Sequence, residues 1–133
     1  MTIYFYDRLG NPVAYSDDDR HIFLYGGEAV AYLESSAVYS YRGTLIGWFE
    51  QGWLRDKDGR CVAFTDQALG GPPRPAKLSK PTQAVKQYTP TEESRDSRSL
   101  RPIHSNAWSA LSAAAFFTRR QQRWPGGMGK PDT

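Results

Sequence analysis

The chain is poor in the residues that build disulfide-bonded, secreted or membrane-spanning proteins. Its 133 residues include a single cysteine, Cys61, so no internal disulfide can form, which fits a reducing compartment. No run approaches the roughly 18 apolar residues of a transmembrane helix, and the start of the chain lacks the basic and apolar regions of a secretory signal. We therefore expect a cytoplasmic protein with no transmembrane segment, for which peripheral contact with a membrane stays open.

Patterns typical of catalytic, metal and cofactor sites are scarce as well. The two histidines, His21 and His104, lie in different regions, and neither has the spacing of a metal-ligand motif. Cys61 stands at an apolar position of a repeat, so packing explains it better than a nucleophilic role. Asp17–Asp19 with His21 can offer oxygens to a cation, but a solvated link is the better interpretation, and Asp56–Gly59 lacks the later glutamate of a calcium loop. The sequence favours a non-catalytic protein and predicts no metal or cofactor.

Charge and aromatic residues are unevenly distributed. Residues 1–69 carry a net charge of −4 and residues 70–133 a net charge of +7, which together give the overall +3; 13 of the 18 aromatic residues precede residue 70. The first part can therefore build a hydrophobic core and the second mostly cannot. The predicted segments are a four-hairpin β-repeat domain (1–69), a Pro/Lys-rich flexible linker (70–104), a short amphipathic helix (105–124) and a disordered tail (125–133).

A short phrase occurs four times in the first part of the chain. It reads “GNPVAY”, “GEAVAY”, “GTLIGW” and “GRCVAF”, and each copy follows a run in which aromatic or β-branched residues alternate with others. Such period-2 alternation predicts strands, and a glycine in a two-residue hairpin turn supplies the positive φ that the turn requires. Each copy is therefore predicted to be a β-hairpin. The turn glycines are Gly27, Gly43 and Gly59, in two-residue turns, and Gly10, which ends a longer turn, Asp7–Gly10.

Inside each phrase, an aliphatic residue, a very small residue and an aromatic residue follow one another. Because neighbouring strand residues face opposite sides, the small residue shares a face with neither neighbour. The small residues predict a crowded axis on which four hairpins converge, and the aromatic and β-branched residues are expected to pack between hairpins. The pattern also allows the reverse assignment of inside and outside. These repeat core residues are Val13, Ala14, Tyr15, Val30, Ala31, Tyr32, Ile46, Gly47, Trp48, Val62, Ala63 and Phe64.

The expected fold is all-β, with eight short strands closed or nearly closed around a central axis so that the edges are protected. The hairpin repeat and the “GGPPRP” after it resemble the four-fold β-flower domain, a small bacterial domain named for hairpin petals around an axis. The resemblance covers about residues 3–81 and resumes at Trp108–Phe117, “WSALSAAAFF”. It implies this fold and no established enzymatic activity. The sequence also resembles MORN-type hairpin repeats more loosely, but it lacks their fuller glycine pattern.

The second part of the chain begins with a proline-rich stretch that favours an extended path. Its cations lie near multiples of three, which would place several on one side of a polyproline-II helix. They are Arg74, Lys77, Lys80 and Lys86.

A short amphipathic helix is predicted at about residues 106–123. Ser105 or Asn106 can cap it, and an apolar stripe recurs at Trp108, Leu111 and Phe116. The helix can dock on the β-domain, or it can present Trp108, Leu111, Phe116 and Phe117 to a membrane interface or to a partner.

These patterns support two functional hypotheses. The first is a non-catalytic binding or scaffold module whose basic tail contacts an unknown protein partner or an anionic lipid surface. The second is a small-ligand-binding or enzyme-associated protein with a pocket at the hairpin axis, for which His21 and Asp17–Asp19 are the candidate residues. A nucleic-acid-binding role is disfavoured, because the sequence has no recognition helix or RNP-like pattern and the β-domain is acidic.

Overall fold

The computed structural model describes residues 2–98 and 100–119, with the backbone alone for residues 118 and 119. Eight antiparallel strands pair in chain order and close into a barrel, so the predicted all-β fold around a central axis is confirmed. A short helix, α1 (Ala113–Arg119), follows. The strands are β1 (Ile3–Tyr6), β2 (Pro12–Ser16), β3 (His21–Phe23), β4 (Ala29–Glu34), β5 (Ala37–Tyr39), β6 (Leu45–Glu50), β7 (Trp53–Arg55) and β8 (Cys61–Phe64).

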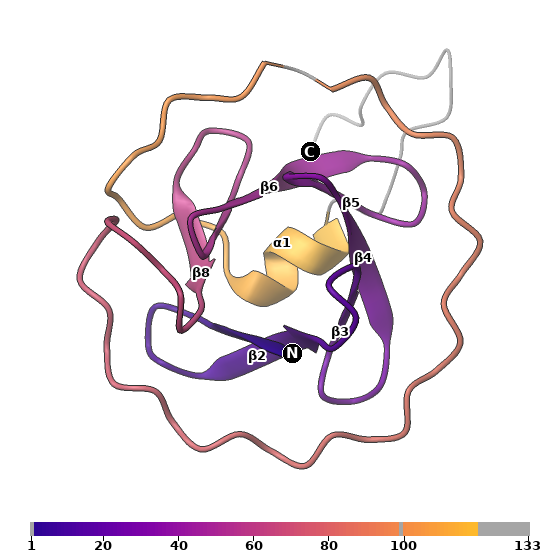
Figure 1. Ribbon diagram of the computed structural model, residues 1–133, viewed down its shortest axis with the longest axis horizontal. Coiled ribbons are helices and arrows are strands. Elements are labelled where there is room, and N and C mark those ends of the chain that lie inside the picture. Colours follow the sequence, from indigo (N-terminus) through magenta and orange to yellow (C-terminus); the bar gives the residue numbers. More distant parts are fainter. Residues whose placement is uncertain (1, 99, 120–133) are drawn as a thin grey trace.

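Consecutive strand pairs form four hairpins, which we call petals 1 to 4 (β1–β2, β3–β4, β5–β6 and β7–β8; Figure 1). The turns of petals 2 to 4 differ from the predicted two-residue form, and the turn of petal 1 differs from the predicted longer form, Asp7–Gly10. In petal 1, Asp7 donates its N–H to Asn11 at 2.9 Å and Gly10 donates to Asp7 at 2.9 Å, which leaves a three-residue loop. The same two bonds occur in all four petals. This loop ends in a left-handed residue, and the repeat glycine fills that position, with φ of 85° at Gly10.

Each petal contains a β-bulge at its repeat aliphatic residue. Phe5 pairs with Ala14 but Tyr6 pairs with Pro12, so Val13 is the extra residue. Val30, Ile46 and Val62 are skipped in the same way in the other petals. The bulge turns these side chains into the central core beside the small residues. The expectation that the β-branched residues pack with the aromatics between hairpins is therefore wrong.

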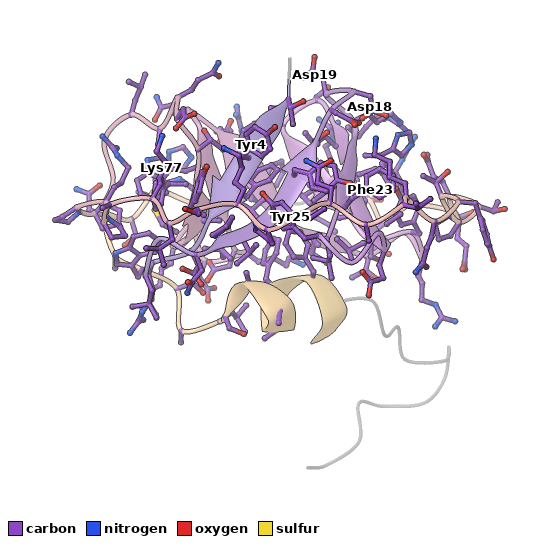
Figure 2. All side chains as sticks on the ribbon, turned by 90° about the horizontal axis from the view of Figure 1, so that it is seen from below. Tyr4, Asp18, Asp19, Phe23, Tyr25 and Lys77 are labelled. Carbon is purple, nitrogen blue, oxygen red and sulfur yellow. The ribbon has the colours of Figure 1, made fainter. Side chains whose placement is uncertain are left out.

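The barrel axis is filled by pairing a large residue with a tiny one in every petal. Phe5, Ile22, Val38 and Leu54 are fully buried, and they lie opposite Ala14, Ala31, Gly47 and Ala63. One end of the barrel is closed by α1, which Figure 2 shows beneath the strands, with Asp18 and Asp19 at the opposite end. Phe116 and Phe117 of this helix are 0% exposed and belong to the central core.

The repeat aromatics lie on the outer side of the barrel wall, where they join adjacent petals. Tyr15 stacks on Phe23 across petals 1 and 2, with ring centroids 6.0 Å apart. Tyr32 on Tyr39 and Phe64 on Tyr6 make the equivalent contacts at two further boundaries. The boundary between petals 3 and 4 differs, because Trp48 pairs there with Arg55.

Residues 70–98 and 100–105, which we call the belt, run around the outside of the barrel (Figure 1). The side view shows the belt between the two barrel ends (Figure 2). The proline-rich segment for which the sequence predicts a flexible linker thus follows an extended course beside all four petals.

The helix exists as predicted, but its predicted start at residue 105 or 106 is wrong. Cys61 donates its N–H to Ala107 at 2.9 Å and Ser109 donates to Cys61 at 2.7 Å, so this stretch lies extended beside β8. The helix begins only at Ala113, and the hydroxyl of Ser112 accepts the N–H of Ala115 at 3.0 Å as the cap. Its predicted end and the predicted tail (125–133) lie outside the described residues.

Candidate functional site

Backbone hydrogen bonds hold the belt against the turns of all four petals. The carbonyl of each repeat glycine accepts a backbone N–H from the belt. The pairs are Leu78 to Gly10 (2.9 Å), Gln87 to Gly27 (2.8 Å), Asp96 to Gly43 (2.7 Å) and Ser105 to Gly59 (3.1 Å). Successive donors are nine residues apart, so one belt repeat of nine residues spans one petal.

A second set of backbone bonds follows the same spacing. Ala84 donates to Tyr25 at 2.8 Å and Glu93 donates to Tyr41 at 2.9 Å. At the two remaining equivalent belt positions the residues are Pro75 and Pro102, which have no N–H to donate.

The repeat glycines are required by the belt as well as by the turns. A Cβ at Gly27 would collide with the carbonyl oxygen of Val85, and one at Gly10 would collide with that of Ala76. Any side chain at these positions would push the belt away from the barrel. The glycine therefore serves both the left-handed turn and the close approach of a second backbone.

Side chains add a clasp at each petal, by which we mean a basic belt residue within ion-pair distance of a barrel carboxylate. The basic residues recur every nine positions, and each carboxylate comes two residues after a repeat aromatic. The four clasps are Lys77 with Asp66, Lys86 with Asp17, Arg95 with Glu34 (3.5 Å) and His104 with Glu50 (2.9 Å).

The clasp cations also lie over barrel aromatics. The Lys86 Nζ is 5.2 Å from the ring centroid of Phe23, and the Arg95 guanidinium is 5.8 Å from that of Tyr39. Lys77 lies over Tyr6 at 5.7 Å. The outer aromatic pairs thus form cation–π platforms for the belt.

All four cations that the sequence offers as partner contacts lie on the belt. Besides Lys77 and Lys86, Arg74 lies over Trp53 at 5.9 Å and Lys80 over Tyr4 at 4.4 Å. The structure brings each of the four against the barrel of its own chain.

The charge asymmetry of the sequence has a counterpart in this arrangement. Residues 1–69 have a net charge of −4 and residues 70–104 a net charge of +4, so barrel and belt neutralise one another. A network at petal 2 illustrates the pairing, where Arg20 contacts Glu34 at 2.9 Å and Glu92 of the belt at 2.7 Å. Opposite charges across such a contact favour a single register.

The fourth clasp, His104 with Glu50, differs from the other three in the groups that surround it. Burial, and then the nearby Arg55 and Arg101 guanidinium groups, lower the pKa of His104. Arg55 takes the place of the aromatic found at the other boundaries, and its Nη1 donates to the carbonyls of Gly59 (2.7 Å) and Ser105 (2.8 Å). Arg101 also pairs with Glu50. The belt is thus held here by buried polar contacts, at the point where the chain turns toward α1.

The apolar residues offered as partner or membrane contacts pack within the protein. Trp108 lies 5.5 Å from the ring of Trp53 and 6.4 Å from that of Phe64. Leu111 packs against the central core, in which Phe116 and Phe117 are buried. Within the described part of the chain, no helix has both the length and the apolar character required to cross a membrane.

The acidic link after β2 has an internal role. The Asp18 carboxylate accepts the His21 Nδ1 contact at 2.6 Å and the N–H groups of His21 and Arg20 at 2.8 and 3.0 Å. Burial raises the pKa of Asp18, but these hydrogen bonds outweigh burial and lower its pKa to about 2. Among the described residues, no group of three or more His, Cys, Asp or Glu side chains is arranged to hold a metal ion.

Cys61 lies in the wall of the barrel. It is fully buried, its Sγ is 3.8 Å from the carbonyl oxygen of Ser105, and burial raises the pKa of its thiol. A raised pKa keeps the thiol protonated, the less nucleophilic form.

One cavity of about 310 Å³ lies beside this wall. It is lined by the turn of petal 1 (Asp7–Leu9), by Cys61 and Val62 of β8, and by residues 108–113. It lies at the rim of the barrel, whereas the axis itself is occupied by buried side chains.

The outward side of the belt carries several large apolar side chains. Val85, Tyr88, Leu100 and Ile103 are between 88% and 95% exposed. The belt therefore fixes its backbone against the barrel and displays these side chains to solvent.

Two signals for this site are present in the sequence. The spacing of nine that relates Lys77, Lys86 and Arg95 is visible, and so are the acidic residues two positions after each repeat aromatic. Their correspondence becomes evident only when nine extended residues are known to span one petal.

No significant match was found among curated proteins or among solved structures. A model of the family described as “4-fold beta flower protein” matches residues 3–117, a range that includes the barrel, the belt and the start of α1. With its four petals around one axis and its match over most of its length, the chain belongs to the 4-fold beta flower protein family.

Proposed function

We propose that the protein is a non-catalytic binding or scaffold module in which the barrel is a rigid platform and the belt is the contact element. One observation carries the proposal: the belt backbone is hydrogen-bonded to all four petals while its large apolar side chains point outward, about nine-tenths exposed. An extended peptide that is already ordered loses little conformational entropy when a partner binds it.

The spacing of the displayed side chains supports recognition by a groove. Val85 and Tyr88 are three residues apart, as are Leu100 and Ile103. A polyproline-II helix repeats one side every three residues, and grooves lined by aromatic residues bind such peptides through side chains on one side. A protein partner with an apolar groove is therefore the contact that we favour.

An anionic lipid surface is the alternative contact for the basic belt. Lys77 and Lys86 are paired with Asp66 and Asp17, so a lipid headgroup would compete with carboxylates of the same chain. The apolar groups that insertion would require, Phe116 and Phe117, are buried in the barrel. These contacts favour the protein partner.

The proposal is tested by photo-crosslinking in the cells that make the protein. A photoreactive phenylalanine analogue replaces Tyr88, and in a matched control it replaces Gln67, which is exposed on the loop after β8. We expect discrete crosslinked species from position 88, lost when Val85→Ser is added, and none from position 67. Equal crosslinking from both positions, or none from either, would contradict the belt as contact element.

A vesicle experiment separates the two kinds of contact. The full chain is sedimented with phosphatidylcholine vesicles and with vesicles that also contain phosphatidylserine, at low and high salt. The proposal predicts no sedimentation with either. If the protein sediments only with the vesicles that contain phosphatidylserine, and only at low salt, the contact is an anionic surface and not a protein partner.

A further inference from the structure

The cavity beside β8 has the features of a ligand site that is separate from the belt contact. Its volume of about 310 Å³ falls in the range of small-molecule sites. It lies where the four-fold pattern ends, because the chain leaves the belt after Ser105 and passes beside Cys61 toward α1.

The turn of petal 1, which lines the cavity, lacks the aromatic ring found in two of the other turns. In petals 2 and 3 the first loop residue is a tyrosine whose ring packs on the barrel, with Tyr25 5.4 Å from Tyr15 and Tyr41 5.3 Å from Tyr32. Petal 1 carries Arg8 instead, which is exposed and lines the cavity. The first turn therefore contributes a cation where two other turns contribute a ring.

Most polar groups around the cavity already have partners in the chain. Asp7 accepts the N–H groups of Leu9 and Asn11, both at 2.9 Å. Ser109 donates its hydroxyl to Asp56 at 2.5 Å. Among the described residues, no carboxylate lies within ion-pair distance of the Arg8 guanidinium, which leaves Arg8 as the charged group able to meet a ligand.

The remaining walls are apolar. Val62 is buried in the core, and Trp108 and Leu111 are half-buried with part of their surface in the cavity. A ligand that covers these side chains needs an apolar body, and one that reaches Arg8 needs a negative charge.

From this arrangement we propose that the cavity binds a small carboxylate with a compact apolar body, such as an aromatic ring or a short aliphatic chain. The ring or chain lies among Val62, Trp108 and Leu111, and the carboxylate pairs with Arg8. This site does not depend on the belt acting as a contact element, so either proposal can fail without the other.

The test is a titration of the full chain with 3-phenylpropionate, followed by amide resonances in two-dimensional NMR spectra. We expect saturable shifts confined to residues around the cavity, including Leu9, Val62 and Leu111. The neutral analogue 3-phenylpropan-1-ol should bind roughly tenfold more weakly, because it lacks the charge-assisted bond. Equal binding of the acid and the alcohol would overturn the carboxylate assignment.

Two variants distinguish the cavity from unspecific binding. Arg8→Gln should weaken 3-phenylpropionate binding roughly tenfold, whereas Lys57→Gln, at the same loop position of petal 4, should leave it unchanged. Ala110→Phe, which places a ring in the cavity, should abolish binding. The spectra report directly whether each variant is folded. Unchanged binding in Arg8→Gln, or shifts spread along the belt, would overturn the proposal.

Discussion

The backbone N–H of Gln87 donates to the carbonyl oxygen of Gly27 at 2.8 Å, so the glycine that shapes the second turn also holds the belt. The equivalent bond occurs at each of the other three petals. The four-fold repeat of glycine therefore reflects a contact between two segments of the chain as much as the geometry of a hairpin.

Replacing this glycine should loosen the belt as well as strain the turn. Gly27 has a φ of 99°, and Gly27→Ala would also drive a Cβ into the Val85 carbonyl. The strain of a left-handed alanine costs about 1–2 kcal/mol, and loss of the adjacent hydrogen bond adds about 1 kcal/mol. Urea denaturation measures the sum.

Gly70→Ala is the matched control for this variant. Gly70 also has a positive φ, 67°, but an added Cβ would meet nothing within 4 Å. Gly70→Ala, at the first residue of the belt, should therefore show the strain of a left-handed backbone without a collision between belt and turn. Equal losses of unfolding free energy in the two variants would mean that the belt does not rest on Gly27.

The clasp between Lys86 and Asp17 should be a measurable but small contribution. Both side chains are more than a third exposed, so solvent screens the pair. A double-mutant cycle with Lys86→Gln and Asp17→Asn should give a coupling of up to about 1 kcal/mol that shrinks at high salt. A control cycle that pairs Lys86 with Asp19 should give no coupling energy. A coupling of the same size in the control would mean that the overall charge of the chain causes the effect, and not the ion pair.

Asp18 should determine part of the acid stability. Its pKa is lowered to about 2 from an ordinary 3.8, so the folded state holds the charged carboxylate more strongly than the unfolded state does. The resulting stabilisation is fully present above the ordinary pKa and is lost as the pH falls toward about 2. In Asp18→Asn, unfolding free energy measured against pH should lack this acid-limb decline. A wild-type slope in that variant would show that Asp18 has no such role.

Phe116 should be essential for the closed end of the barrel. It is 0% exposed in the central core, and Phe116→Ala should lower the unfolding free energy by about 3–5 kcal/mol. Leu100→Ala, at a residue 95% exposed, should change it by less than about 0.5 kcal/mol. A small effect of Phe116→Ala in denaturant unfolding would indicate that α1 is not part of the core in solution.

The strands could be predicted because their information is local. Alternating aromatic and β-branched residues, bounded by a glycine in each copy, are sufficient to define four hairpins. Whether the hairpins close within one chain or pair across two stays open from the sequence, because closure depends on the long-range pairing of Tyr6 with Phe64. The position of the aliphatic residues could not be derived in this way. Strict alternation places Val13 on the face of Tyr15, and only the bulge opposite Phe5 and Tyr6 moves it into the core.

The course of the belt could not be predicted from local sequence patterns, for a different reason. Its residues lack the periodic apolar pattern from which core-forming elements are identified, because its course is determined by backbone bonds to turns some 60 residues earlier, such as Gln87 to Gly27. Lysines near Pro75 and Pro81 therefore indicated an external anionic partner, whereas their structural partners are carboxylates and rings of the same chain. The helix start cannot be derived from local patterns either, because the extended pairing of Ala107 and Ser109 with Cys61 is a long-range contact.

Amide hydrogen exchange along the belt of the full chain tests the contact between belt and barrel most directly. This contact predicts slow exchange at the belt donors and fast exchange between them, with a recurrence of nine residues. The protected amides should be those of Leu78, Ala84, Gln87, Glu93, Asp96 and Ser105. Uniformly fast exchange from residue 78 to residue 105 would contradict the belt and return this segment to the role of a flexible linker.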